Sequence, residues 1–205
     1  MGICYIVGAG ECLEHFAPQT GDFLIAADGG YRHLASRGLL PHLLLGDFDS
    51  FEGELPNCPI LRFPPEKDDT DTALAIREGE KRGYTEFRIY GCLGGARIDH
   101  TIGMLATLLS CARRGLSVKL YGGGRVLFVL TDGTYQFPPA CRGYLSVFAF
   151  GGDAEGVTLK GLKYPLADAV LREDTPLGVS NEFLQNTPAT VRVKRGSLLL
   201  VCEDF

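Results

Sequence analysis

Two aspartates separated by one residue follow a strongly apolar segment. Residues 43–45 are Leu-Leu-Leu, Gly46 comes next, and Asp47 and Asp49 then flank Phe48. The apolar run predicts a buried strand of a parallel sheet, with Phe48 pointing into the core. Ligands of α/β proteins bind beyond the carboxyl ends of such strands, and carboxylate oxygens there suit Mg²⁺. The alternative is a plain polar turn, because Asp and Ser are common turn residues.

Polar, glycine-containing sequences follow two other predicted strands. Asp28-Gly29-Gly30 follows the strand at 23–27, and the glycines would let a ligand approach the backbone closely. The alternative is that Asp28 caps the helix predicted at 31–37. The segment 91–100, Gly-Cys-Leu-Gly-Gly-Ala-Arg-Ile-Asp-His, follows the strand at 86–90.

In segment 91–100, Arg97 presents a planar fork suited to phosphate, and His100 is either a base or a structural residue. Asp99 and His100 stand at the start of an apolar helix predicted at about 101–113.

An acidic segment follows the strand predicted at 60–63. Residues 66–72 read Glu-Lys-Asp-Asp-Thr-Asp-Thr and run into an apolar helix. A capping Asp or Thr and a first-turn acid explain one or two of these aspartates, but not three behind a lysine. Asp68 and Asp71 are three residues apart, so they could share one face of the first turn. Lys67 could reach phosphate oxygens as a point charge.

The acidic residues recur at one place in the strand–turn–helix rhythm. Asp28, Asp47, Asp49, Asp71 and Asp99 should therefore gather along one edge of the sheet. Like charges crowd unfavourably unless a cation neutralises them. The convergence predicts a Mg²⁺-dependent phosphate site.

The rhythm of the chain divides it into two predicted domains. Residues 1–124 alternate strands and helices, which predicts a parallel, Rossmann-like α/β domain with helices on both faces of the sheet. Residues 125–205 carry short strands between turn residues, which predicts a small antiparallel β-sandwich. Its strands are expected at 126–130, 134–137, 145–150, 157–159, 167–171, 190–194 and 198–202, whereas 178–183 does not look like a strand.

Composition excludes several classes of protein. The net charge of −5 argues against nucleic acid as the main partner. The chain has no apolar run of about 18 residues, so we expect no membrane span. The N-terminus lacks the basic region of a signal peptide. The seven scattered cysteines predict buried thiols in a reducing compartment, so we expect a cytoplasmic protein. Neither a GxGxxG fingerprint nor a GxxxxGK[ST] loop occurs.

Six motifs, in order, resemble those of the thiamine pyrophosphokinase (thiamine diphosphokinase) family. In the first half they are Ala27-Asp28-Gly29-Gly30, Gly46-Asp47-Phe48-Asp49-Ser50, Lys67-Asp68-Asp69-Thr70-Asp71 and Leu93-Gly94-Gly95-Ala96-Arg97-Ile98-Asp99-His100. In the second half they are Gly161-Leu162-Lys163-Tyr164-Pro165-Leu166 and Ser180-Asn181-Glu182-Phe183. Each motif alone is weak, but the six together cover nearly the whole chain.

The resemblance implies transfer of the diphosphoryl group of ATP to the hydroxyethyl arm of thiamine, giving AMP and thiamine diphosphate. It implies an α/β catalytic domain that binds ATP and Mg²⁺, a β-sandwich domain that binds thiamine, and a homodimer with thiamine where the subunits meet. The implied metal ligands are Asp47, Asp49 and Asp71. The implied catalytic residues are Asp47, Asp71 and Asp99, with Asp99 near the reacting hydroxyl.

The resemblance also assigns residues to the two substrates. The nucleotide side would be lined by Asp28, Gly29, Lys67, Gly94, Gly95 and Arg97. Ser180 and Asn181 would hydrogen-bond the pyrimidine of thiamine. Tyr164 stands where some members carry Trp, and the thiazolium would stack on it as a cation–π contact; this chain has no Trp.

Three other functions remain open at this point. The same metal cluster would serve a pyrophosphokinase for another hydroxymethyl heterocycle, such as a pterin, although Ser180-Asn181-Glu182 favours thiamine. A sensor could bind thiamine or nucleotide without turnover, but it could dispense with the full set of acids. A metal-dependent phosphohydrolase would release phosphate from ATP without thiamine.

Overall fold

The computed structural model describes residues 2–48, 55–64, 69–94 and 98–203. The chain divides into two compact units. The first unit comprises Met1–Thr107 and Gly115–Gly123, and the second comprises Leu108–Arg114 and Gly124–Phe205. The fold is mixed α/β, with a large sheet and a second, antiparallel sheet, as the sequence predicts at this level.

The first unit contains a parallel sheet in the order β6-β5-β1-β2-β3-β4. Its strands are β1 (Cys4–Val7), β2 (Phe23–Ala27), β3 (Leu43–Gly46), β4 (Ile60–Arg62), β5 (Glu86–Tyr90) and β6 (Ser117–Gly122). β1 and β3 are buried along their whole length, because strands covered on both faces are apolar on both faces. The parallel pairing confirms the predicted sheet.

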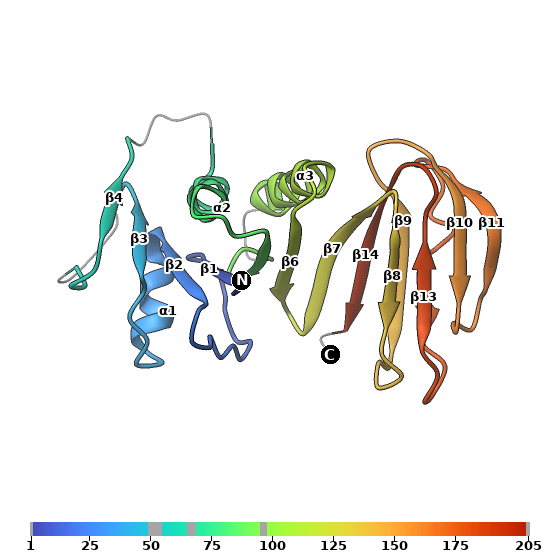
Figure 1. The fold of residues 1–205 in the computed structure, drawn as a ribbon, viewed down its shortest axis with the longest axis horizontal. Coiled ribbons are helices and arrows are strands. Elements are labelled where there is room, and N and C mark those ends of the chain that lie inside the picture. The colour runs from blue at the N-terminus through green and yellow to red at the C-terminus, as the bar shows by residue number, and fades with distance from the viewer. Residues whose placement is uncertain (1, 49–54, 65–68, 95–97, 204–205) are drawn as a thin grey trace. The chain divides into compact units, whose positions relative to one another are not determined.

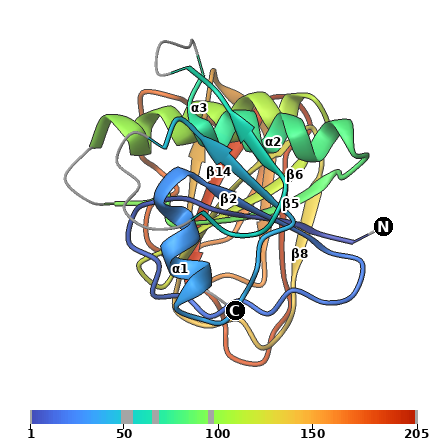
Figure 2. The same ribbon diagram turned by 90° about the vertical axis from the view of Figure 1, so that its left-hand side faces the viewer.

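Helices cover both faces of this sheet (Figure 2). On one face, α2 (Asp71–Lys81) packs so closely that a Cβ at Gly79 would lie 2.5 Å from Phe87 of β5. On the other face, Tyr5 contacts Phe16, and the guanidinium of Arg37 lies 5.3 Å from the Phe16 ring, just beyond α1 (Tyr31–Ala35). Successive residues of a strand point to opposite faces, so the neighbours Cys4 and Tyr5 face α2 and Phe16 respectively.

The third helix, α3 (Ile98–Arg113), begins three residues before the predicted start. Asp99 and His100 therefore lie within its first turn. Residues up to Thr107 group with the first unit, and Leu108–Arg114 group with the second.

The second unit is built from antiparallel pairs, yellow to red in Figure 1. Its strands run in the orders β12-β9-β14-β7 and β11-β10-β13-β8. They are β7 (Arg125–Thr131), β8 (Thr134–Phe137), β9 (Tyr144–Ala149), β10 (Ala154–Lys160), β11 (Leu166–Leu171), β12 (Asn181–Glu182), β13 (Ala189–Arg192) and β14 (Ser197–Glu203). The Phe137 ring of β8 contacts Phe128 of β7 and Phe183, which follows β12. These rings therefore form a core shared by the two sets of strands.

One expectation for the second unit is wrong. Residues 178–183 do not look like a strand, yet Asn181 and Glu182 form β12 by pairing with Leu145 and Tyr144 of β9. The pairing partner lies far away in sequence, so the local polar pattern gives no signal of it.

Two expectations from composition can be compared with the structure. All seven cysteines are free thiols, and five of them are buried: Cys4, Cys12, Cys111, Cys141 and Cys202. Among the described residues, none of the helices has the length and apolar character needed to cross a membrane.

Candidate active site

A cavity of about 720 Å³ lies within the first unit, at the carboxyl ends of its strands. Four carboxylates from three different loops line it: Asp28, Asp47, Asp69 and Asp71. The remaining lining residues are Gly8, Ala9, Gly10, Ala27, Thr70, Thr72, Gly91, Cys92, Leu93, Gly94, His100 and Met104. Its size is that of a small-molecule site. The predicted gathering of acids is therefore observed for Asp28, Asp47 and Asp71.

The loops after β1 and β5 form a wall of bare backbone. The amide of Gly8 donates to the carbonyl of Tyr90, and the amide of Gly10 donates to Gly91, each at 2.8 Å. A Cβ at Gly8 would lie 2.5 Å from Cys92 Sγ, and one at Gly91, where φ is +66°, would lie 2.5 Å from the Gly8 carbonyl oxygen. Only glycine permits this approach, which leaves the wall open to a ligand.

Asp28 occupies a special backbone position at the end of β2. Its φ is +47°, and the 3-10 turn Asp28–Gly30 links the strand directly to α1. The helix has no side-chain cap, so the alternative that Asp28 caps it is wrong. A Cβ at Gly46 would lie 3.1 Å from the Asp28 Cα. Glycine at this position therefore lets the end of β3 bring Asp47 beside Asp28.

Phe48 anchors the loop that carries Asp47. Its ring is buried, as predicted, and the guanidinium of Arg62 from β4 lies 5.1 Å from the ring centroid. Its φ of +62° is unusual for a bulky residue, and such conformations cluster at functional sites. The buried ring of Phe48 therefore fixes the residue that directly follows Asp47, which lines the cavity.

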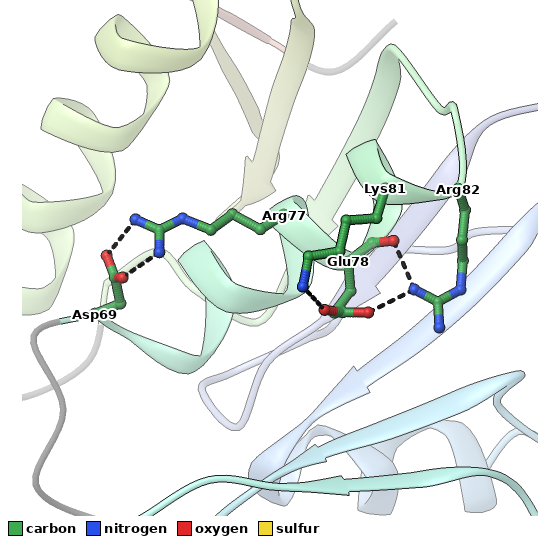
Figure 3. A network of polar contacts seen from close by, with 5 residues as sticks. All are labelled: Asp69, Arg77, Glu78, Lys81 and Arg82. Atoms are coloured by element: carbon green, nitrogen blue, oxygen red, sulfur yellow. Dashed lines mark hydrogen bonds and ion pairs between the residues drawn. The ribbon is translucent and has the colours of Figure 1, made fainter.

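The start of α2 presents two further carboxylates. Thr70 caps the helix, because its Oγ1 accepts a hydrogen bond from the Ala73 amide at 3.2 Å. Asp71 is the first helical residue, where an acid suits the positive end of the helix dipole. Asp69 also lines the cavity and pairs with Arg77 of the same helix (Figure 3). Thr70, Thr72 and Asp69 are cavity residues that the sequence-based site assignment missed, although their segment was singled out.

The first turn of α3 contributes His100 rather than Asp99 to the cavity. His100 and Met104 lie four residues apart, hence on the same face of the helix, and both line the cavity. Asp99, predicted to lie near the reacting hydroxyl, is not among the described lining residues.

The one cysteine among the described cavity-lining residues, Cys92, has a protonated and weakly reactive thiol near neutral pH. Burial raises the pKa of Cys92 to about 11, and the hydrogen bond with Thr72 offsets only part of this rise. The two side chains lie 3.3 Å apart, Sγ to Oγ1. Cys92 therefore stays a neutral thiol near pH 7 and is neither a ready nucleophile nor a metal ligand.

The three residues predicted to contact thiamine lie in the second unit. Asn181 is buried, and its Oδ1 accepts hydrogen bonds from the amides of Tyr164 at 3.0 Å and Glu182 at 2.9 Å. Its Nδ2 donates to the Tyr164 carbonyl at 2.8 Å. Ser180 is exposed with φ +57°, and Tyr164 is 58% exposed. Asn181 thus holds the backbone of Tyr164, whose ring points to solvent.

The remaining predicted site residues lie partly inside and partly outside the described residues. Gly29 and Gly94 are described, and Gly94 lines the cavity. Asp49, Lys67, Gly95 and Arg97 lie outside the described residues. Although several carboxylates line the cavity, no three His, Cys, Asp or Glu side chains of the described ranges are grouped so that they could hold one metal ion. The predicted set of Asp47, Asp49 and Asp71 therefore stays a prediction.

Comparison with known sequences identifies the family. Residues 17–120 match the family described as "Thiamin pyrophosphokinase, catalytic domain". Residues 134–198 match "Thiamin pyrophosphokinase, vitamin B1 binding domain". The chain belongs to the thiamin pyrophosphokinase family. The resemblance drawn from the six motifs is therefore confirmed, and so is the activity of a thiamine diphosphokinase, an enzyme for which ATP is the co-substrate.

Individual relatives agree with this assignment. The thiamine pyrophosphokinase of Bacillus subtilis (strain 168) is 27% identical over 184 residues, which cover 86% of this chain and 85% of the relative. A crystal structure of thiamin pyrophosphokinase from Geobacillus thermodenitrificans is 27% identical with a TM-score of 0.86, covering 99% of this chain and 98% of the other. Thiamine pyrophosphokinase from Bacillus subtilis matches the fold with a TM-score of 0.89 at 24% identity, covering 98% of each chain.

Proposed function

We propose that the cavity of the first unit binds the polyphosphate of ATP for diphosphoryl transfer to thiamine. The observation that carries this proposal is the meeting of Asp28, Asp47 and Asp71 in one cavity beside the glycine wall. Glycine backbone gives phosphate close access to the main chain, and the carboxylates require positive charge between themselves and the phosphates. A cation held there satisfies both groups.

The donor chemistry of the cavity fits Mg²⁺. Asp47 and Asp71 supply hard carboxylate oxygens from two neighbouring loops, and Asp49 follows Asp47 by two residues. Mg²⁺ is held in proteins by one or two carboxylates together with water and substrate phosphates. We therefore assign Asp47, Asp49 and Asp71 as its ligands. When bound, the ion supplies positive charge that offsets the negative charge of the phosphates.

The other residues of the first unit position the nucleotide in this proposal. A Cβ added at the cavity-lining Gly94 would have nothing within 4 Å, so there is open space at this residue. The nucleotide-side residues are Asp28, Gly29, Lys67, Gly94, Gly95 and Arg97. Asp99 is assigned to the side of the reacting hydroxyl, one residue from the cavity-lining His100.

Thiamine is assigned to the second unit. The match to a vitamin B1 binding domain over residues 134–198 supports thiamine rather than a pterin as the acceptor. Tyr164 offers an exposed aromatic face for the cationic thiazolium. The exposed Ser180 directly precedes Asn181, whose side chain hydrogen-bonds the backbone of Tyr164. The hydroxyl of Ser180 and the remaining N–H of Asn181 are assigned to the pyrimidine.

A homodimer with thiamine at the subunit interface completes the proposal. Large apolar side chains are exposed around the thiamine segment of the second unit, which is unusual for a surface that stays in water. They are Tyr144, Tyr164, Leu177, Val179 and Leu184. A second copy of the chain would cover them. The location we propose is the cytoplasm, in line with the free thiols.

The reaction follows from placing the two substrates in line. The hydroxyl oxygen of thiamine forms a bond to the β-phosphorus of ATP, and the bond from that phosphorus to the α,β-bridging oxygen breaks. AMP leaves with the bridging oxygen, and the hydroxyl proton passes to a carboxylate, Asp71 or Asp99, and then to water. Positioning and charge compensation dominate such a transfer, so Asp47 and Asp71 contribute by fixing charge rather than by bonding to the substrate.

A product assay tests the proposed function. The protein is incubated with ATP, Mg²⁺ and thiamine, and AMP, ADP and thiamine diphosphate are separated. We expect AMP and thiamine diphosphate in equal amounts, with no AMP when thiamine is left out. Formation of ADP or inorganic phosphate without thiamine would instead indicate a phosphohydrolase. AMP formed only with a different alcohol would show that this alcohol, and not thiamine, is the acceptor substrate.

A further inference from the structure

The carboxylate of Asp69 is held by a two-point contact with Arg77. Arg77 Nη1 lies 2.6 Å from Asp69 Oδ2, and Nη2 donates to Oδ1 at 3.2 Å. Figure 3 shows the planar guanidinium facing the carboxylate end to end, with Arg77 reaching back from within α2. Such a fork fixes the direction of the carboxylate as well as its distance. Arg77 itself is not among the described cavity-lining residues.

The negative charge of Asp69 lies beside the cavity that we assign to the polyphosphate of ATP. Asp69 lines the same cavity as Asp28, Asp47 and Asp71. In our proposal, Asp47 and Asp71 are compensated by the cation that arrives with ATP. A further carboxylate with no compensating charge would repel the phosphates. Arg77 supplies that charge from the protein itself.

The exposure of the pair argues that stability is not its main purpose. The side chains of Arg77 and Asp69 are 54% and 28% exposed, and pairs as open as this contribute little to folding. A second ion pair on the same helix is different. Glu78 is 10% exposed and contacts both Lys81 and Arg82 (Figure 3), and none of these three is among the described cavity-lining residues. The first network therefore involves a carboxylate of the cavity, whereas the second joins residues within the carboxyl-terminal end of α2.

We propose that Arg77 is a positioning residue for the ATP cavity: it neutralises Asp69 and holds it aside, so that the polyphosphate can enter. The inference rests on the proposed placement of the polyphosphate in this cavity. Arg77 acts through Asp69 and needs no contact with the nucleotide.

The two substrates carry opposite charges, which gives the proposal a specific signature. Without Arg77, the bare Asp69 carboxylate repels the anionic polyphosphate, and we expect the KM for ATP to rise about tenfold. Thiamine is a cation, so its KM should stay the same or fall. The kcat should change by less than about threefold, because Asp69 and Arg77 do not reach the reacting atoms in this account.

The test compares Arg77→Gln, Asp69→Asn and the double variant in steady-state assays with ATP, Mg²⁺ and thiamine. Because the double variant removes both charges, we expect its KM for ATP to return to within about threefold of the unaltered protein. Lys81→Gln removes the same charge from the same helix, away from the cavity, and should leave the KM for ATP unchanged. Melting temperatures are measured for all four variants.

The KM for ATP of the double variant distinguishes charge compensation by Arg77 from a structural role of its two-point contact with Asp69. If the fork only holds the loop, the double variant will be as impaired as Arg77→Gln, and the proposal is overturned. Arg77→Lys provides a second check if Arg77→Gln fails to fold, since lysine keeps the charge and loses the fork. A KM for ATP close to that of the unaltered protein supports neutralisation, and a tenfold rise contradicts it.

A further variant distinguishes this inference from the proposed function beneath it. Calorimetric titration of ATP with Mg²⁺ into Asp71→Asn reports whether the cavity binds the polyphosphate at all. Weak binding by Asp71→Asn together with unchanged binding by Arg77→Gln would overturn the role of Arg77 alone. Unchanged binding by both variants would overturn the placement of ATP as well.

Discussion

The two regions assigned to the substrates use their polar side chains in opposite ways. In the first unit, Asp28, Asp47 and Asp71 line a cavity beside bare glycine backbone, and our proposal assigns their carboxylates to the polyphosphate and its cation. In the second unit, the amide of Asn181 is buried and occupied with the backbone of Tyr164. There, our proposal assigns the exposed ring of Tyr164 to thiamine, and the Asn181 amide supports the backbone that carries this ring.

This difference follows from the charges of the ligands. A polyphosphate brings many negative charges, so its site needs cations held by carboxylates that remain accessible. Thiamine brings one delocalised positive charge on an aromatic ring, and a single well-oriented tyrosine can meet it. Substitutions in the cavity should therefore affect chemistry at constant stability. Those in the Tyr164–Asn181 segment should affect stability and thiamine binding together.

The largest effect is expected for Asp71→Asn. The change removes a proposed metal ligand but leaves the core intact, so kcat should fall about 100-fold or more. The melting temperature should change little, because only a first-turn charge is lost. Steady-state kinetics and thermal melting provide the two readouts. Asp174→Asn, an exposed change in the second unit, is the matched control, and near-normal turnover of Asp71→Asn would exclude Asp71 from the metal site.

Asn181→Ala should be the most destabilising of these variants. It leaves the part-buried amide and carbonyl of Tyr164 without their partner, which costs about 2 kcal/mol of unfolding free energy. The KM for thiamine should also rise, since Tyr164 loses its support. Urea unfolding measures the loss of stability. Gln185→Ala alters an exposed amide nearby as a control. Equal unfolding free energies of the two variants would show that the hydrogen bonds between Asn181 and Tyr164 do not stabilise the protein.

Tyr164→Ala should separate binding from stability. The ring is 58% exposed, so its removal should leave the melting temperature nearly unchanged. The KM for thiamine should rise about tenfold through loss of the cation–π contact, while the KM for ATP stays constant. Tyr164→Phe keeps the aromatic face and should behave like the unaltered protein. An unaltered KM for thiamine in Tyr164→Ala would remove Tyr164 from the site.

The smallest effect concerns Glu78 on α2. Hydrogen bonds from Lys81 and Arg82 lower the pKa of its carboxyl below the ordinary 4.5. A lowered folded-state pKa stabilises the protein above the unfolded value, and this stabilisation is lost as the pH falls through the folded pKa. Glu78→Gln should therefore cost about 1 kcal/mol at pH 7 and progressively less below pH 4.5. A constant difference in unfolding free energy down to strongly acidic pH would contradict this.

The sequence predicted the parallel sheet well, because apolar runs such as 43–45 reflect burial on both faces. It also predicted that Asp28, Asp47 and Asp71 converge, since the carboxyl ends of parallel strands meet at one edge. It left open whether His100 is a base or a structural residue, because periodicity does not fix where α3 begins, and a shift of three residues nearly completes a turn.

The hydrogen-bond partners of individual polar side chains lay beyond sequence reasoning. The motif assigns Asn181 to thiamine, which stays a prediction, but it gives no signal that the same side chain hydrogen-bonds a residue 17 positions away. Asp69 and Arg77 lie eight positions apart, and their contact depends on how the chain enters α2. Such contacts depend on tertiary geometry, which composition and periodicity do not encode.

Titration of ATP with Mg²⁺ into Asp71→Asn and Asn181→Ala, followed by calorimetry, tests the division of labour between the two regions most directly. We predict that Asp71→Asn weakens ATP binding about tenfold or more, whereas Asn181→Ala, if folded at the temperature used, binds ATP like the unaltered protein. Weakened ATP binding in Asn181→Ala with normal binding in Asp71→Asn would contradict the assignment of the nucleotide to the acidic cavity.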